Sequence, residues 1–195
     1  MKLAKIGIYF LLAALVLDMV FKLSQFFEPN WEADVHLYPF GLIWDYFLVG
    51  VTLLEVIGLI YLAVSQRKDT KFRNVSIMLA FTLVLETYNF TADYYATALN
   101  LYMAIYSVTT VLIIISSFLF GSLFKQKVDD QGKNWVNYYY ILYFASLILY
   151  FGNNVIPGFS EVGFYLYTMV KFAISFTLAA ILFKSHQFLN TKWKF

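Results

Sequence analysis

Long runs of apolar residues alternate along the chain with short polar segments. Each run is close to the roughly 20 residues that an α-helix needs to cross the hydrocarbon core of a bilayer. The pattern predicts six transmembrane helices, at residues 5–27, 39–64, 75–97, 99–124, 135–156 and 162–188. A tight turn near residues 98–100 further predicts that the third and fourth of these helices are antiparallel neighbours.

The apolar runs also decide the fold class. Strands of a transmembrane β-barrel alternate apolar and polar residues, whereas stretches such as VLIIISSFLF (residues 111–120) do not alternate. The sequence therefore predicts an all-α polytopic helical bundle, a single transmembrane domain over residues 1–195. The N-terminal run is similar to a secretory signal, but Asp18 and Lys22 interrupt it and no small-residue cleavage site follows, so we expect a retained first helix.

Composition agrees with this interpretation. Hydrophobic residues make up 61% of the chain and charged residues only 13%, compared with about 25% charged residues in soluble domains. Most of the surface is therefore expected to face lipid. The net charge of +2 is too small to indicate nucleic acid as a partner.

Basic residues outside the helix centres all fall on one predicted side of the membrane. The other side holds Glu28, Glu32, Asp34, His36 and Glu161, without lysine or arginine. Because basic loops stay in the cytoplasm, this asymmetry predicts that both termini are cytoplasmic. The twelve basic residues are Lys2, Lys5, Arg67, Lys68, Lys71, Arg73, Lys125, Lys127, Lys133, Lys184, Lys192 and Lys194.

Several ionisable or amide side chains lie within the predicted helices, where each charge costs roughly 2.5–3.5 kcal/mol on insertion scales and usually pairs or lines a cavity. At about 1.5 Å per residue, Lys171 and Glu86 fall near the midplane, Glu55 alone is displaced inward, and the others fall in the outer half. We hypothesise a ligand or ion pocket that opens to the outer face, with Lys171 and Glu86 at its floor. Its candidate residues are Asp18, Lys22, Asp45, Glu55, Glu86, Asn89, Asp93 and Lys171.

Structural explanations stand beside this hypothesis. Asp18 and Lys22, four residues apart, are also expected as a local pair with Lys22 reaching toward the interface. Asp45 and Asp93 suit helix ends in the headgroup zone, and Lys171 with Glu86 suits a buried pair that fixes helix register.

Aromatic residues are abundant, and they suit the membrane surface better than a ligand site. Trp135 and the run Tyr138, Tyr139 and Tyr140 begin the fifth predicted helix. Tryptophan and tyrosine are enriched at membrane–water interfaces, so this position predicts an interfacial belt.

Several kinds of chemistry lack the residues they need. The chain has no cysteine, which excludes disulfides, iron–sulfur ligation, zinc–thiolate sites and thiol catalysis. His36 and His186 lie in different flanks of the membrane, so we expect no haem and no metal site. No serine-hydrolase elbow, phosphate-binding loop or histidine box is present, which leaves enzymatic activity undecided.

Two short motifs carry a resemblance to a known family. The first helix ends in Phe21-Lys22-Leu23, and the second carries Glu55 three residues before Gly58 in Leu53-Leu54-Glu55-Val56-Ile57-Gly58-Leu59. Over residues 6–95 this pattern resembles the DoxX-like superfamily, which includes the DoxD-type subunits of thiosulfate:quinone oxidoreductases. The family commonly has four helices and an arginine where Lys5 stands. The resemblance implies a four-helix core with two added helices, a redox- or quinone-linked membrane subunit, and roles for Lys22 and Glu55.

Three functions follow as expectations. The sequence favours an integral membrane subunit or accessory protein that works with other membrane proteins in a larger, redox- or quinone-linked assembly. A small transporter or channel that uses the outward-facing polar pocket is the first alternative. A membrane enzyme acting on a lipid or quinone is the second. A multi-pass location in a bacterial inner membrane fits the retained first helix and the lysine-rich inner loops.

Overall fold

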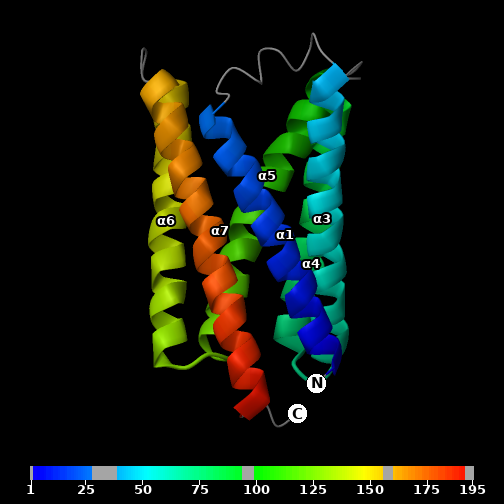
Figure 1. Cartoon of the computed structure of the whole chain (residues 1–195). Helices are drawn as coiled ribbons and strands as arrows, with labels where there is room; N and C mark the ends of the chain where they lie inside the picture. Colours follow the sequence, from blue (N-terminus) through cyan, green and yellow to red (C-terminus); the bar gives the residue numbers. More distant parts are fainter. Residues whose placement is uncertain (1, 28–38, 94–98, 156–159, 192–195) are drawn as a thin grey trace.

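The described residues of the computed structural model, 2–27, 39–93, 99–155 and 160–191, fold into six long helices (Figure 1). These helices confirm the predicted all-α fold. Their bounds are α1 Lys2–Phe27, α3 Pro39–Ser65, α4 Thr70–Asp93, α5 Leu99–Lys125, α6 Asp130–Val155 and α7 Ser160–Thr191.

Two helices begin about five residues earlier than predicted, because aspartates cap them. The backbone N–H of Phe72 donates to Asp69 Oδ1 at 3.0 Å, and the N–H of Gly132 donates to Asp129 Oδ1 at 2.7 Å. An aspartate in this position satisfies a backbone donor that the first turn leaves open. Because of these caps, α4 and α6 begin in the polar segments that precede their apolar runs.

Successive helices run in opposite directions, so both ends of the chain lie at the same end of the bundle (Figure 1). The α3–α4 and α5–α6 loops lie there too. We call this basic end the inner end, following the positive-inside rule, and the opposite end the outer end. The antiparallel pairing of α4 with α5 is confirmed, while the turn predicted between them falls largely in residues 94–98, outside the described residues.

Four of the helices are long and apolar enough to cross a membrane, with candidate spans at Lys2–Ser24, Tyr46–Ser65, Ser107–Lys125 and Tyr165–His186. The other two, α4 and α6, contain 24 and 26 residues and pack beside them. At about 1.5 Å per residue, both are longer than the hydrocarbon core of roughly 30 Å. The molecule is a helical membrane bundle, and α4 and α6 are its two more polar members.

The helices form a ring, in which α1, α3, α4, α5, α6 and α7 each contact the next and α7 contacts α1. Two glycines allow a close approach between α1 and α3. A Cβ atom built on Gly7 would lie 2.7 Å from the carbonyl oxygen of Gly58, and one built on Gly58 would lie 2.9 Å from the carbonyl oxygen of Gly7. Small residues allow this contact between backbones, as they commonly do at helix interfaces in membranes.

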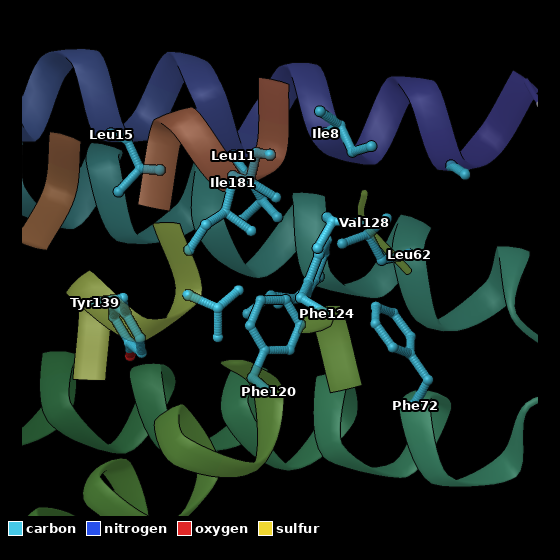
Figure 2. Close-up of a cluster of buried hydrophobic side chains, with 14 of the residues drawn as sticks. Ile8, Leu11, Leu15, Leu62, Phe72, Phe120, Phe124, Val128, Tyr139 and Ile181 are labelled. Carbon is cyan, nitrogen blue, oxygen red and sulfur yellow. The ribbon is translucent and has the colours of Figure 1, made fainter. Parts of the chain in front are cut away.

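The inner half of the ring is filled by apolar side chains contributed by all six helices. At its centre the rings of Phe72, Phe120 and Phe124 pack together, with centroids 4.8–5.8 Å apart (Figure 2). We call these three rings the inner plug. Phe72 lies in the first turn of α4 and Phe124 in the last turn of α5, so the plug lies near the inner end of the bundle.

The contact between α5 and α6 is the least extensive in the ring. Its aromatic contacts join Phe118 on α5 to Tyr140 and Tyr143 on α6. Toward the outer end the two helices diverge, since α5 crosses behind the bundle toward α4 while α6 stays beside α7 (Figure 1). The helices α5 and α6 therefore pack against each other mainly in the inner half of the bundle.

Candidate functional site: a charged chamber in the outer half of the bundle

The charged residues of the membrane region continue the apolar stripes that face the centre of the ring. On α1, Ala4, Ile8, Leu11 and Leu15 are buried at alternating spacings of four and three, and Asp18 and Lys22 extend the same series. This spacing keeps residues on one face of a helix. The stripe is thus apolar in its inner half and charged in its outer half.

The same change occurs on three more helices. Glu55 stands four residues before Leu59 on α3, Glu86 stands three residues after Leu83 on α4, and Lys171 stands three residues before Ile174 on α7. In each case the apolar residue packs in the core cluster, and the charged residue follows toward the outer end. Four helices therefore direct charged side chains toward the central axis above the inner plug.

Asp18 and Lys22 form an ion pair on α1 that reaches across to α7. Ser175 Oγ accepts a hydrogen bond from Lys22 Nζ at 2.9 Å and donates to Asp18 Oδ2 at 2.6 Å. The expected local pair therefore forms, but Lys22 is engaged with α7 rather than extended to the interface. This charged triad joins α1 to α7 and leaves little net charge of its own.

Glu86 faces inward and is nevertheless exposed. Its position continues the stripe of Phe72, Leu79 and Leu83, which pack in the core, while its own side chain is accessible. Protein atoms crowd the carboxylate enough to desolvate it, and it interacts electrostatically with Lys171 and Lys22 across the ring. The Glu86 side chain therefore faces the axis of the ring and keeps an accessible surface.

Lys171 lies opposite Glu86, on α7. Its Nζ lies 5.4 Å from the centre of the Tyr167 ring, a cation–π distance, and its charge interacts with those of Glu86 and Lys22. Among the described residues, no ion pair joins Lys171 to Glu86. The predicted floor of the pocket thus consists of two opposite charges that face each other without contact.

Glu55 completes the group from α3. Its carboxylate is largely covered and interacts electrostatically with Asp18, Glu86 and Lys22. No described side chain donates a hydrogen bond to it. We call this group of inward-facing residues the outer chamber, defined by Asp18, Lys22, Glu55, Glu86, Lys171 and Ser175.

Three of the predicted site residues cannot be placed in the chamber. The side chains of Asp45, Asn89 and Asp93 lie outside the described part of the structure. The five that are described come together: Asp18, Lys22, Glu55, Glu86 and Lys171. All five share the central axis even though they come from four helices.

Sequence reasoning missed Ser175 and Tyr167, which contact the predicted lysines. Both lie four residues from Lys171, one on each side, and therefore on the same face of α7. That spacing was a usable signal for contacts with Lys171. The contact of Ser175 with Asp18 joins residues 157 positions apart and had no local signal.

The predicted aromatic belt at the start of α6 is correct only in part. Tyr138 is 54% exposed, as an interfacial residue should be, but Tyr139 is buried in the core. Tyr140 donates its hydroxyl to the carbonyl oxygen of Phe118. Consecutive residues on a helix point 100° apart, so three adjacent tyrosines could not all face the membrane surface.

An apolar hollow of about 470 Å³ lies between α4 and α5, away from the charged stripes. Leu85, Ala104, Ile105, Val108 and Thr109 line it. Its volume falls within the range of small-molecule sites, but its walls offer almost no polar group that would orient a ligand.

An ion pair joins two loops at the inner end of the bundle, beneath the plug. Lys127 Nζ lies 2.8 Å from Asp69 Oδ2 and 5.3 Å from the centre of the Phe72 ring. The hydrogen bond from Lys127, together with the bond from the Phe72 N–H, lowers the pKa of Asp69 below its ordinary value. The pair connects the α3–α4 loop to the α5–α6 loop, directly beneath the chamber and plug.

No family model matches the chain, and comparisons with curated proteins and with solved structures found no match. Within the described ranges, no group of three or more histidine, cysteine, aspartate or glutamate side chains could hold a metal ion. The candidate site is therefore described from its own residues: an apolar cluster on the inner side, opposed charges from four helices, and helices α5 and α6 that diverge toward the outer end.

Proposed function

We propose that this protein is a small membrane transporter whose outer chamber receives a small charged or polar solute. One observation carries the proposal. On four helices the inward-facing stripe changes from apolar to charged residues, and on each helix the charged residues lie on the outer side of the same apolar plug. Intramembrane charges that face a bundle interior are characteristic of substrate and ion pathways. A purely structural bundle has no need of an exposed carboxylate on its inward face.

The arrangement suits alternating access. The helices α5 and α6 diverge toward the outer end, whereas the inner plug and the Asp69–Lys127 pair lie at the inner end. Transport requires the reverse arrangement as a second state, in which α5 and α6 approach each other at the outer end and the plug separates. The limited α5–α6 contact favours such a movement, because few contacts have to be broken there.

Because the chain has no cysteine, sided thiol labelling tests the proposal without a known solute. Leu83→Cys lies one turn inward of Glu86 on the same stripe. In proteoliposomes, a membrane-impermeant thiol reagent is expected to label it from the outer side and also, in separate vesicles, from the inner side. Val84→Cys is the matched control, since Val84 is 49% exposed on the lipid-facing side of α4 and should stay unlabelled.

Each result has a distinct meaning. Labelling of Leu83→Cys from both sides supports a transporter. Labelling from the outer side alone contradicts transport and describes a static outward receptacle. Absence of labelling from either side contradicts the chamber itself.

A membrane subunit is the second candidate. Two apolar stripes flank the open seam, Val108, Val111 and Ile115 on α5 and Ile141, Phe144 and Ile148 on α6, and all six side chains are exposed. A transmembrane helix of another protein would cover both. The DoxX-like resemblance supports the same proposal and would give it a redox- or quinone-linked partner in a bacterial inner membrane. Stoichiometric copurification of another membrane protein in mild detergent is the expected result for a subunit, and a chain that purifies alone contradicts it.

A further inference from the structure

The charges of the outer chamber do not balance. Its described groups comprise three carboxyls, Asp18, Glu55 and Glu86, and two amines, Lys22 and Lys171. Asp18 and Lys22 neutralise each other as an ion pair, and Glu86 faces Lys171 across the chamber. Glu55 is left over, without an opposite charge of its own.

The neighbours of Glu55 make this imbalance more severe. Asp18 on α1 and Glu86 on α4 both repel its charge, and the attraction of Lys22 is shared with Asp18 and Ser175. An uncompensated charge in a low-dielectric interior is unfavourable, and a buried carboxyl commonly becomes neutral instead. A hard metal cation would need about six oxygen ligands, which the described side chains around Glu55 do not supply. A proton needs one oxygen atom.

We propose that Glu55 is a proton-binding site and that its proton couples the movement of the bundle to a proton gradient. This inference rests on the proposed transport function. A proton from the outer aqueous phase forms an O–H bond with a carboxylate oxygen of Glu55. The same bond breaks after the inner plug opens, and the proton passes to the inner phase, with no change in oxidation state.

Protonation links charge to conformation in a simple way. With Glu55 protonated, the described chamber groups sum to zero charge, so the chamber can close and lose its water. With Glu55 ionised, the chamber carries a net negative charge and is most stable when open to water. The occluded state that precedes inward opening is therefore reached with the proton bound.

Infrared spectroscopy tests the bound proton directly, since the C=O stretch of a protonated carboxyl is separate from the carboxylate bands. At neutral pH the purified full-length protein is expected to show a protonated-carboxyl band that disappears in Glu55→Gln. The band should shift but remain in Glu55→Asp, and it should persist in Glu86→Gln as the matched control. A wild-type protein without the band, or a band that survives Glu55→Gln, overturns the proton site.

Sided labelling tests the coupling. In the Leu83→Cys background, inner-side labelling should fall as pH rises, by up to about tenfold per pH unit, the limit for one bound proton. Glu55→Gln mimics the protonated state and should remove this dependence. Comparing the two backgrounds at each pH cancels the titration of the thiol itself. An unchanged pH dependence in Glu55→Gln overturns the coupling.

The two experiments separate this inference from the proposed function. If Leu83→Cys is never labelled from the inner side, transport and coupling both fail. The infrared result still decides whether Glu55 holds a proton.

Discussion

Tyr140 on α6 donates its hydroxyl to the carbonyl oxygen of Phe118 on α5 at 3.0 Å, and its ring stacks on the Phe118 ring at a centroid distance of 5.2 Å. The two contacts secure the inner part of the seam between α5 and α6. A carbonyl that accepts this bond within a helix has a second acceptor lone pair, so the bond adds to the helical ladder without replacing it.

Replacing Tyr140 with phenylalanine should keep the ring contact and remove the hydrogen bond. We expect a loss of stability of about 0.5–1.5 kcal/mol, the usual contribution of one such bond. Thermal unfolding in detergent measures it. Tyr138→Phe is the control, because Tyr138 is exposed on the same helix and should unfold at the wild-type temperature. Equal shifts for both variants would contradict the role of the bond.

The glycine contact between α1 and α3 predicts a strong position dependence on a single helix. In Gly58→Ala the new methyl group would lie 2.7 Å from Leu11 Cγ and 2.9 Å from a backbone carbonyl, so α1 and α3 must separate. Overpacking of this kind costs about 1–3 kcal/mol. Gly50→Ala has no atom within 4 Å of its new methyl group and should retain or raise the unfolding temperature. A destabilised Gly50→Ala with a stable Gly58→Ala would refute the close packing.

The ion pair of Asp18 with Lys22 should show strong non-additivity. Asp18→Leu removes the ion-pair partner of the partly buried Lys22 ammonium, which keeps its hydrogen bond to Ser175, and Lys22→Met isolates the Asp18 carboxylate in the same way. Each single variant is expected to lose about 3 kcal/mol, because removal of one partner isolates the other charge. The double variant should recover most of that loss. A double-mutant cycle of unfolding free energies measures the coupling, and additive losses would mean that the pair contributes nothing.

Asp69 predicts a dependence of stability on pH. The bonds from Lys127 and the Phe72 N–H lower its pKa in the folded protein, so its contribution is present above the ordinary aspartate pKa of about 3.9. That contribution is lost as the pH falls below this value and passes through the folded-state pKa. Unfolding temperatures measured between pH 3 and 7 should therefore fall more steeply in the wild type than in Asp69→Asn. Parallel curves would contradict the assignment.

Much of the fold could be predicted because the bilayer restricts the choices. Apolar runs as long as a membrane span predicted the helices. The basic residues were predicted to lie on one side of the membrane, and that side corresponds to the end of the bundle where α1 begins and α7 ends. The starts of α4 and α6 were missed because Asp69 and Asp129 act as caps, a signal of single residues rather than of runs.

The sequence predicted which residues belong to the candidate site better than it predicted how they are arranged. Asp18 and Lys22 continue the spacing of Ala4, Ile8, Leu11 and Leu15, so their inward direction follows from the sequence alone. The packing of the bundle decides which helices face each other across the axis. No local sequence pattern predicted that Ser175 would contact Asp18. The alternative in which Lys171 and Glu86 form an ion pair is not seen among the described residues, because depth along a helix says nothing of the distance between helices.

The ion pair on α1 also bears on how the chain is made. Asp18 and Lys22 are one helical turn apart and close their contact within a single segment, so that segment can enter the bilayer with its charges already neutralised. An isolated charge at that stage would cost roughly 2.5–3.5 kcal/mol. The Ser175 that completes the triad is synthesised 157 residues after Asp18. Biosynthesis can therefore insert the first helix without waiting for the last, and the contact with α7 is added when the chain is complete.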